Sequence, residues 1–497
     1  MTSLVPVLAA VVPGLPLAGM VLALLVRTPR QGDTLAVATA IASAAAGLLL
    51  AGIALARGGG SALRGQWYLI DGASGVLLAV IAVVGLCSTL LSPAYLRSSG
   101  RSWTTAARSR SLYYAALFMF WGALLAVPIA GNLAAVWLIV EATTAASALL
   151  VAFSGRRDAL EAGWKYLLLT TLGLSVAFLG IIVLAIGQAN AGHHNVRALD
   201  WHALQAAAHA MPAQATLLAF VLLLAGLATK IGWAPVHNWL PDAHSEAPPP
   251  ISALLSAALL PSVMLVAWRV KEILQPSVGP GTTRAVFIGF GLTSMIVAVP
   301  FLWRSLPFKR LLAYSSLEHM GIIALGIGFG TPLAIAGVVL HVAGHGLAKA
   351  LGFYAALPLL RIQPKAATHA PVAVLNDSPA TATAMGVSLI ALSGLPPSPL
   401  FLSELLILLG GLAAGELLIS AIAVLAMALG FLGLLHALME GVIGDEGRRR
   451  SRRRSREERP IMALTAILGT GMLGCGLVGV LVLPGSDFVQ ALARGVL

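Results

Sequence analysis

Apolar runs, each long enough to cross a lipid bilayer, follow one another along almost the whole chain. A helix rises 1.5 Å per residue, so about 20 apolar residues cover a hydrocarbon core of about 30 Å. Only 10% of the residues are charged, whereas soluble domains carry about 25%. The sequence therefore predicts an all-α, polytopic membrane protein with about 14 transmembrane helices. The expected spans are Leu4–Val26, Thr34–Ala56, Ile70–Leu91, Leu112–Ala130, Leu133–Phe153, Trp164–Gly187, Ala215–Trp239, Ile251–Trp268, Ala285–Trp303, Leu311–Gly330, Leu333–Leu359, Ala380–Leu409, Leu417–Leu438 and Ile461–Leu483.

The basic residues are distributed unevenly between the two sides of these spans. Assigning successive connections to alternate sides places 21 of the 31 Lys and Arg residues on one side and seven on the other. The positive-inside rule makes the first side cytoplasmic and places both termini on the outer side of an inner (cytoplasmic) membrane. The run from Arg448 to Arg459 is then a cytoplasmic topology anchor. Its alternative function is to bind anionic lipid or nucleic acid, and we expect no nucleic-acid partner.

Prolines interrupt two of the expected spans, at positions where a continuous helix would lose hydrogen bonds. The seventh span contains Pro235 and Pro241, and the twelfth contains LPPSPLF at Leu395–Phe401. The two interruptions are five spans apart. Because five is odd, a directly repeated five-helix unit must cross the membrane in opposite directions, which makes helices 4–8 and 9–13 inverted repeats. Matching interruptions in inverted repeats are typical of ion pathways in transporters.

This repeat predicts four parts of the chain. Residues 1–110 form an N-terminal three-helix segment, and residues 111–270 form the first five-helix repeat. Residues 271–440 form the second repeat. Residues 441–497 contain the basic cytoplasmic loop and the last transmembrane helix.

Ionisable residues lie inside several spans, where each costs about 2.5 to 3.5 kcal/mol on insertion scales. In the eleventh span, polar side chains recur every four residues and therefore share one helical face. Such a set predicts a proton pathway, with neutral histidines as intermediate stations. The main candidates are Glu141, Lys230, His341, His345, Lys349 and Glu404, and the accessory polar candidates are Glu161, Lys165, Asp242, His244, Glu318 and His319.

A buried lysine beside a carboxylate is a suitable proton switch. The charged form of a lysine is disfavoured by burial and favoured by a nearby negative charge. We therefore expect Lys230 to hold its proton when Glu141 is close and to release it when Glu141 moves away. Taken alone, Lys230 is also compatible with snorkelling toward Trp233 and Trp239.

No metal or cofactor site is predicted. The HxxxH spacing of His341 and His345 has no third ligand at a recognisable distance, and Asp242, His244 and Glu246 match no zinc pattern. Cys87 and Cys475 lie alone in apolar spans, so no disulfide or iron–sulfur framework is expected. The chain also lacks a glycine-rich dinucleotide fingerprint.

Five segments resemble the antiporter-like proton-pumping subunits of complex I, energy-converting hydrogenases and multisubunit cation/proton antiporters. They are GNLAAVWLIVEATTAASALLVAF from Gly131, ATKIGWAPVHNWLPDAHSEAPPPISALLS from Ala228, KRLLAYSSLEHMG from Lys309, HVAGHGLAKALGFY from His341 and LSGLPPSPLFLSELLIL from Leu392. The segment DALEAGWKYLLLTTLG from Asp158 is most similar to component F of hydrogenase-4 and formate hydrogenlyase complexes. Subunit M of NADH-quinone oxidoreductase is nearly as similar.

This resemblance implies that Glu141 and Lys230 are the family's key glutamate and lysine, and that Glu404 ends the exit half-channel. It implies a proton-translocating subunit whose partners are other membrane subunits and a peripheral redox arm. One position departs from the family pattern, because Pro261 stands where many relatives carry a polar group in the eighth helix. A non-conducting structural subunit therefore remains an alternative function. Independently of Pro261, a subunit of a multisubunit Na⁺(K⁺)/H⁺ antiporter is the other alternative.

Overall fold

The computed structural model describes residues 4–57, 62–98, 107–190, 196–444 and 458–482, and α-helices make up most of these ranges. Twelve helices in the described ranges are long and apolar enough to cross a membrane. Together with α5 and the shorter apolar helices α17 and α18, they account for all the expected spans and confirm an all-α polytopic fold. Most of the basic run from Arg448 to Arg459 lies outside the described residues.

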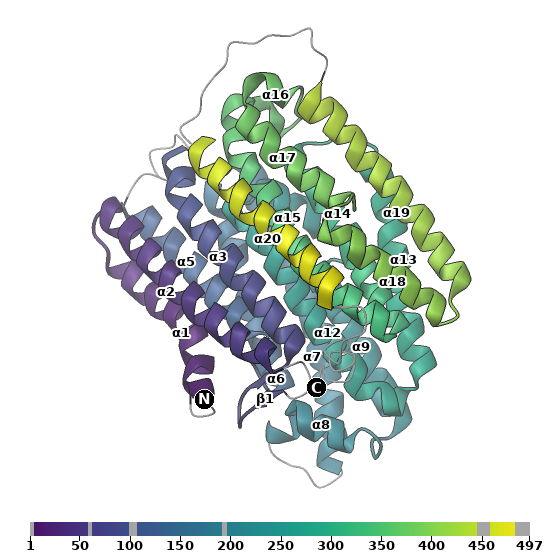
Figure 1. Cartoon of the computed structure of the whole chain (residues 1–497). Helices are drawn as coiled ribbons and strands as arrows, with labels where there is room; N and C mark the ends of the chain where they lie inside the picture. Colours follow the sequence, from purple (N-terminus) through teal and green to yellow (C-terminus); the bar gives the residue numbers. More distant parts are fainter. Residues whose placement is uncertain (1–3, 58–61, 99–106, 191–195, 445–457, 483–497) are drawn as a thin grey trace.

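The helices form one bundle, with α1, α2 and α5 at one side and α13, α18 and α19 at the other (Figure 1). The N-terminal elements are α1 (Leu4–Leu25), α2 (Pro29–Ala56), the two-stranded antiparallel hairpin of β1 (Leu63–Arg64) and β2 (Leu69–Ile70), and α3 (Gly72–Ser98). The first repeat comprises α5 (Ala107–Ala126), α6 (Leu133–Val151), η1 (Ala152–Ser154), α7 (Arg157–Asn190), η2 (Val196–Leu199), α8 (Trp201–Ala207), α9 (Ala213–Ile231), α10 (Trp239–Glu246), α11 (Pro249–Leu254), η3 (Leu255–Leu259) and α12 (Leu260–Val278).

The second repeat has the same order of long helices, with its own interruption in the fourth place. It comprises α13 (Pro280–Leu302), α14 (Phe308–Phe329), α15 (Pro332–Ile362), η4 (Pro364–Ala367), α16 (Val374–Asp377), α17 (Pro379–Leu392), α18 (Pro399–Ala413), α19 (Leu417–Ala437) and η5 (Leu438–Ile443). The last element, α20 (Glu458–Val482), packs against α15, α17 and α18 (Figure 1). The exact domain boundaries stay predictions, because α3 of the N-terminal segment packs against both repeats, on α11 and on α15.

Both predicted interruptions separate two helices. The seventh span was expected to run to Trp239, but α9 already ends at Ile231, where Gly232 adopts the left-handed conformation (φ 79°) that favours glycine. The twelfth span divides into α17 and α18, and Ser398 caps α18 by accepting a hydrogen bond from the Leu400 N–H. At both interruptions prolines are exposed on the surface of the chain: Pro235 in the first, and Pro396 and Pro397 in the second.

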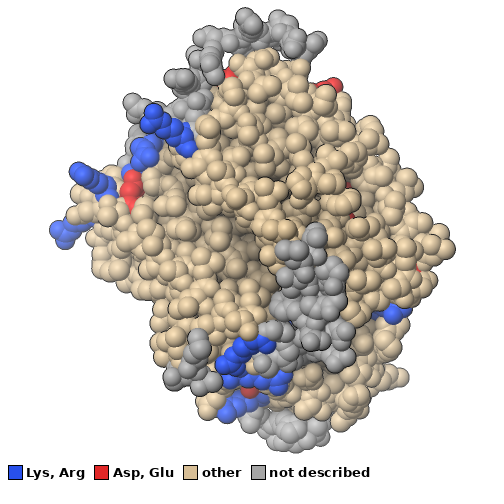
Figure 2. Space-filling model, in the orientation of Figure 1, with Lys and Arg blue, Asp and Glu red and all other residues tan. Residues whose placement is uncertain are grey.

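The two least apolar spans, α14 and α15, lie in the centre of the bundle together with the α11–α12 segment. The hydrophobic windows of the α11–α12 segment and of α14 are fully buried, and that of α15 is 83% buried, whereas those of α1, α13 and α19 are 33 to 39% buried. Peripheral helices therefore present apolar side chains to lipid and enclose the ionisable ones. On the face seen in Figure 2, Lys and Arg lie toward the two ends of the helices, with an uncharged belt between them.

The eighth span contains a π-helical turn, η3, directly before Pro261. In a regular helix the proline would remove the hydrogen bond to the Ala257 carbonyl, and its ring would collide with that carbonyl. A π turn is a common local solution to such a conflict. The turn lets one nearly straight segment, Pro249–Val278, cross the core.

A buried ion pair joins the N-terminal segment to the first repeat. Arg269 donates hydrogen bonds to the Asp71 carboxylate (2.6 Å) and to Ser74 Oγ (2.6 Å), while the other oxygen of Asp71 accepts the Ser74 N–H at the start of α3. Both charged side chains are 1% exposed. The guanidinium also lies over the Trp201 ring, at 5.8 Å from its centroid, so α3, α8 and α12 are held together here.

Candidate functional site

Lys230 lies in the last turn of α9, directly before the interruption, and is completely buried. Its ammonium donates hydrogen bonds to Tyr166 Oη (2.5 Å) and Thr144 Oγ1 (2.8 Å), and lies 4.5 Å from the centroid of the Tyr166 ring. The Tyr166 hydroxyl is in turn 2.7 Å from Ser147 Oγ. The C-terminal end of a helix also favours a positive charge. Lys230 therefore faces the protein interior, and snorkelling toward the tryptophans does not describe it.

Glu141 approaches this site from α6 but does not touch Lys230. Its Oε1 accepts a hydrogen bond from Thr171 Oγ1 (2.8 Å), and its Oε2 is buried without a hydrogen-bond partner. Among the described residues no ion pair joins Glu141 to Lys230, although the two charges lie within electrostatic range of each other. Thr144 is one helical turn from Glu141 on α6 and bonds Lys230, so its hydroxyl group lies near both Glu141 and Lys230.

Charged accessory residues line a polar cavity of about 370 Å³ where α7 begins. Lys165 forms ion pairs with Glu161 (2.5 Å) and Asp242 (3.7 Å), and Arg310 reaches the same Asp242 carboxylate at 3.1 Å. A cavity of this size and polarity holds several water molecules. Tyr166, the residue that follows Lys165 on α7, is buried and does not line this cavity.

His244 lies on α10 between Asp242 and Glu246 in the sequence, but its side chain lies apart from theirs. Asp242 and Glu246 pair with basic side chains at the cavity, whereas the His244 ring is buried and packs on Trp239 and Phe353. Its Nδ1 is 2.8 Å from the Leu240 carbonyl oxygen, and its Nε2 has no partner. Lys349 of the second repeat acts on it electrostatically. His244 therefore lies between the two repeats.

Lys349 is a completely buried amine in the second repeat. It donates hydrogen bonds to Ser315 Oγ (2.6 Å) and to the Leu312 carbonyl (2.7 Å), both on α14. Glu318, one turn further along α14, is 3% exposed and lies within electrostatic range of Lys349. A second helix thus supplies a buried carboxyl group to a buried lysine, as α6 does in the first repeat.

Three buried histidines continue this line toward α18. His319 Nδ1 and His341 Nε2 are 3.0 Å apart, and His341 Nδ1 is 2.9 Å from Ser403 Oγ. The rings of His319 and His345 have centroids 5.3 Å apart. Ligand atoms of His319, His341 and the partly buried Glu404 all lie within 4.8 Å of one another.

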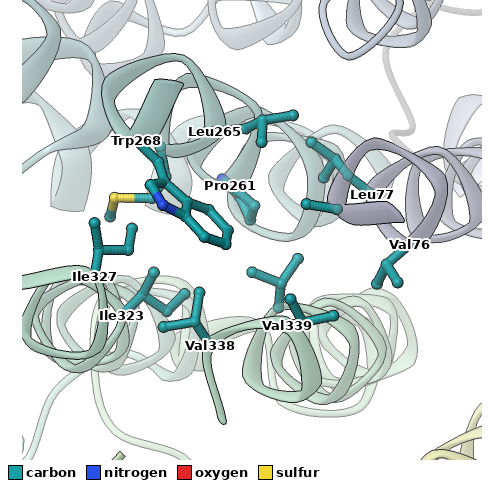
Figure 3. A pocket seen from close by; sticks show the side chains of 12 residues that line it. Val76, Leu77, Pro261, Leu265, Trp268, Ile323, Ile327, Val338 and Val339 are labelled. Atoms are coloured by element: carbon teal, nitrogen blue, oxygen red, sulfur yellow. The ribbon is translucent and has the colours of Figure 1, made fainter. Parts of the chain in front are cut away.

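Pro261 faces an apolar pocket and offers nothing to this polar line. Figure 3 shows Pro261, Leu265 and Trp268 opposite Ile323, Ile327, Val338 and Val339, with Val76 and Leu77 at one side. The pocket holds about 20 Å³, room for about one water, but its apolar walls favour a dry state. The eighth span contributes a hydroxyl elsewhere, since Ser256 Oγ in the π turn is 2.8 Å from Ser316 Oγ.

The structure places the sequence candidates in two groups. The larger group is buried between the helices and contains Lys230, His244, Glu318, His319, His341, His345 and Lys349, with the partly buried Glu141 and Glu404 at its two ends. The smaller group, Glu161, Lys165 and Asp242, lines the polar cavity. Sequence reasoning missed the hydroxyl groups that hold the line together: Thr144, Ser147, Tyr166, Thr171, Ser315 and Ser403.

Comparison with known proteins agrees with this architecture. The chain is 32% identical over 375 residues to the hydrogenase-4 component F homolog of Methylacidiphilum infernorum, which covers 74% of this chain and 78% of that protein. The fold is similar to a chain of the membrane-bound sulfane sulfur reductase, an archaeal respiratory membrane complex (TM-score 0.83, 19% identity, 98% and 97% of the two chains). It is also similar to a chain of the Mrp complex from Dietzia sp. DQ12-45-1b (TM-score 0.78, 18% identity, 98% and 99% of the two chains).

The family match covers more than half of the sequence and includes most of both repeats. Residues 130–430 match the family described as NADH:quinone oxidoreductase/Mrp antiporter, TM. This range extends from the start of α6 into α19, and so contains Glu141, Lys230, Lys349 and Glu404. The chain therefore belongs to the NADH:quinone oxidoreductase/Mrp antiporter transmembrane family.

Proposed function

We propose that this chain is the proton-translocating membrane subunit of a redox-driven complex of the energy-converting hydrogenase or complex I type. The observation that carries the proposal is the line of buried ionisable groups through both repeats, from Glu141 through Lys230, His244 and Lys349 to Glu404. Buried charges are costly in a membrane and mark ion pathways. Similarity to a hydrogenase-4 component F homolog favours the hydrogenase type.

Proton transfer in this proposal follows hydrogen-bonded steps within each repeat. Water in the cavity beside Lys165 supplies the first repeat, and Lys230 exchanges its proton through Tyr166 and Thr144. His244 connects Lys230 to Lys349, and the histidines connect Lys349 to Glu404. Movement of Glu141 changes the proton affinity of Lys230, because a nearby carboxylate favours the charged amine.

The proposal also specifies the partner subunits of the chain and its membrane. Other membrane subunits and a peripheral redox arm are its partners, and this chain carries no redox centre of its own. The membrane is the inner (cytoplasmic) membrane, with both termini outside and the Arg448–Arg459 loop in the cytoplasm. Purification through a tag on this chain tests the arrangement: nickel–iron or iron–sulfur proteins should copurify, whereas an antiporter would bring down membrane partners alone.

Neutralising Glu404 tests the proposed pathway. In inverted membrane vesicles that contain the complex, Glu404→Gln is expected to lower proton pumping by about 100-fold, the effect typical of removing one positioned proton-transfer group. The measurement is lumen acidification, followed by a pH-sensitive dye during electron transfer. Glu416→Gln is the matched control, because Glu416 only pairs with Arg284 at 3.3 Å. Equal pumping by the two variants would remove Glu404 from the pathway.

Removing the Tyr166 hydroxyl should slow pumping without stopping it. Tyr166→Phe deletes the 2.5 Å hydrogen bond to Lys230 but leaves the one to Thr144. Loss of one hydrogen bond to a charged group corresponds to about 1.5 kcal/mol or more, so we expect about a tenfold lower rate in the same vesicle assay. Tyr354→Phe, which removes another buried hydroxyl bonded to Ser88, should pump normally.

Pro261 favours a second candidate function, that of a non-conducting structural subunit. The pocket beside Pro261 is lined by apolar side chains, which supports this alternative because they offer no proton-carrying group at that point of the eighth span. The two functions differ in the vesicle assay. If this chain is only structural, the complex should still pump at the wild-type rate after Glu404→Gln.

A further inference from the structure

We propose that His319, His341, His345 and Glu404 form a binding site for a divalent transition-metal ion of the Zn²⁺ class. Such ions take imidazole nitrogens at about 2.0 Å and carboxylate oxygens at about 2.0 to 2.2 Å, commonly in tetrahedral geometry. Three of these residues already hold their ligand atoms within 4.8 Å of one another. The HxxxH spacing gave no indication of this, because the further ligands come from α14 and α18.

The hydrogen bonds around His341 orient it as a metal ligand. Ser403 Oγ donates its hydrogen to the Leu400 carbonyl (2.9 Å), so its lone pairs accept the Nδ1–H of His341 at 2.9 Å. His341 Nε2 therefore carries a lone pair, and it points at His319 Nδ1, 3.0 Å away. A ligand histidine whose other nitrogen is held by a second residue is the usual arrangement at protein metal sites.

Unpartnered nitrogens surround this point. His319 Nε2 and both ring nitrogens of His345 are buried without a hydrogen-bond partner, which is unfavourable for a polar atom that water cannot reach. A shift of the His319 proton from Nδ1 to Nε2 would give two lone pairs, on His319 Nδ1 and His341 Nε2, that face each other. His345 lies outside the 4.8 Å group, with its ring centroid 5.3 Å from that of His319 and 6.4 Å from that of His341, and is the candidate for a fourth ligand after a change of its side-chain rotamer.

Charges of both signs lie near the proposed site: two carboxyl groups favour a cation, whereas the Lys349 ammonium lies within electrostatic range of all three histidines and opposes one. Glu404 contributes one carboxylate, and Glu318 places a second within electrostatic range of it. The ammonium of Lys349 is held by Ser315 and the Leu312 carbonyl on α14. Glu404 is partly buried, and its carboxylate lies against Gly394 in the second interruption.

An ion bound at this site would replace the hydrogen bond between His319 and His341. If the proposed function is correct, proton transfer to Glu404 then stops, and Zn²⁺ is an inhibitor that acts from within the pathway. This regulatory consequence rests on the proposed function, whereas metal binding itself does not.

The test measures binding and pumping separately on the purified complex. Titration with Zn²⁺ after chelator treatment should show one tight ion per chain, and Co²⁺ should give the absorption of a four-coordinate site. His319→Gln and His341→Gln should each weaken binding by at least tenfold. Ser403→Ala, which keeps all ligands but frees the His341 ring, should weaken it by about 10- to 100-fold. His369→Gln, at an exposed histidine, should bind as the wild type does.

The outcomes distinguish the two proposals. Equal Zn²⁺ affinity in the wild type, His319→Gln and His341→Gln would overturn the metal site, as would the absence of a tight ion in the wild type. Zn²⁺ that binds at the site but leaves pumping unchanged would overturn the inhibition. A failed metal site combined with lost pumping in Glu404→Gln would leave the proposed function standing.

Discussion

Replacing Lys230 with alanine is expected to abolish proton pumping, lowering the rate by at least about 100-fold in membrane vesicles while the complex still assembles. The ammonium group of Lys230 is completely buried in the first repeat, and its two hydrogen-bond partners, Tyr166 and Thr144, are neutral. Without the amine, the proton has no binding site between the cavity and His244. Lumen acidification and the rate of electron transfer are measured in parallel, so that loss of coupling is separated from loss of turnover.

A second substitution at the same position separates charge from proton exchange. Lys230→Arg keeps the positive charge, but a guanidinium is not deprotonated in proteins, so pumping should be lost as in the alanine variant. Lys365→Ala, which removes an exposed lysine of η4, is the control and should pump normally. Wild-type pumping in Lys230→Ala would contradict the pathway and favour the structural function. If Lys230→Arg still pumps while Lys230→Ala does not, Lys230 acts only as a fixed positive charge and does not exchange a proton.

The Asp71–Arg269 pair should produce the largest effect on stability. Asp71→Ala leaves the Arg269 guanidinium buried and without its 2.6 Å carboxylate partner, which is expected to lower the free energy of unfolding by about 3 to 5 kcal/mol. Thermal unfolding of the purified chain in detergent measures the change. The exposed pair of Glu161 and Lys165 provides the comparison, because Glu161→Ala breaks a solvent-screened ion pair and should lower the free energy of unfolding far less.

A double substitution tests whether the cost arises from the unpaired charge. Asp71→Leu combined with Arg269→Met removes both charges and should recover most of the stability lost in Asp71→Ala, since apolar replacements of buried pairs are often neutral. If the double variant is as unstable as Asp71→Ala, the loss comes from the start of α3, where Asp71 also accepts the Ser74 N–H.

The fold was largely predictable because its strongest determinants are local in sequence. Apolar length specifies each span, and proline specifies the two interruptions, at Pro235 and at Leu395–Phe401. The ends of the helices were less predictable. The expected end of the seventh span at Trp239 was wrong by eight residues, because the left-handed turn at Gly232 ends α9 before the first proline is reached.

The site was predictable only in its ionisable members. A charged residue in an apolar span is rare enough to be noticed, and Lys230, His341 and Lys349 are all buried as expected for a pathway. Hydroxyl groups such as those of Thr144 and Tyr166 are common in membrane helices, so nothing in the sequence distinguished them. The separation of Glu141 from Lys230 depends on how α6 and α9 pack around α7, which spacing along one chain does not contain.

The exposed prolines at the two interruptions have a consequence for handling this molecule. Hydrocarbon chains offer no donors or acceptors, so irregular backbone that faces lipid is not tolerated in a bilayer unless protein or water covers it. At Pro235 and at Pro396–Pro397 the solitary polypeptide has such backbone on its outside. Companion subunits that cover these two patches would raise the melting temperature of the chain. Thermal stability measured on the isolated chain in detergent will therefore underestimate its stability in the assembled complex.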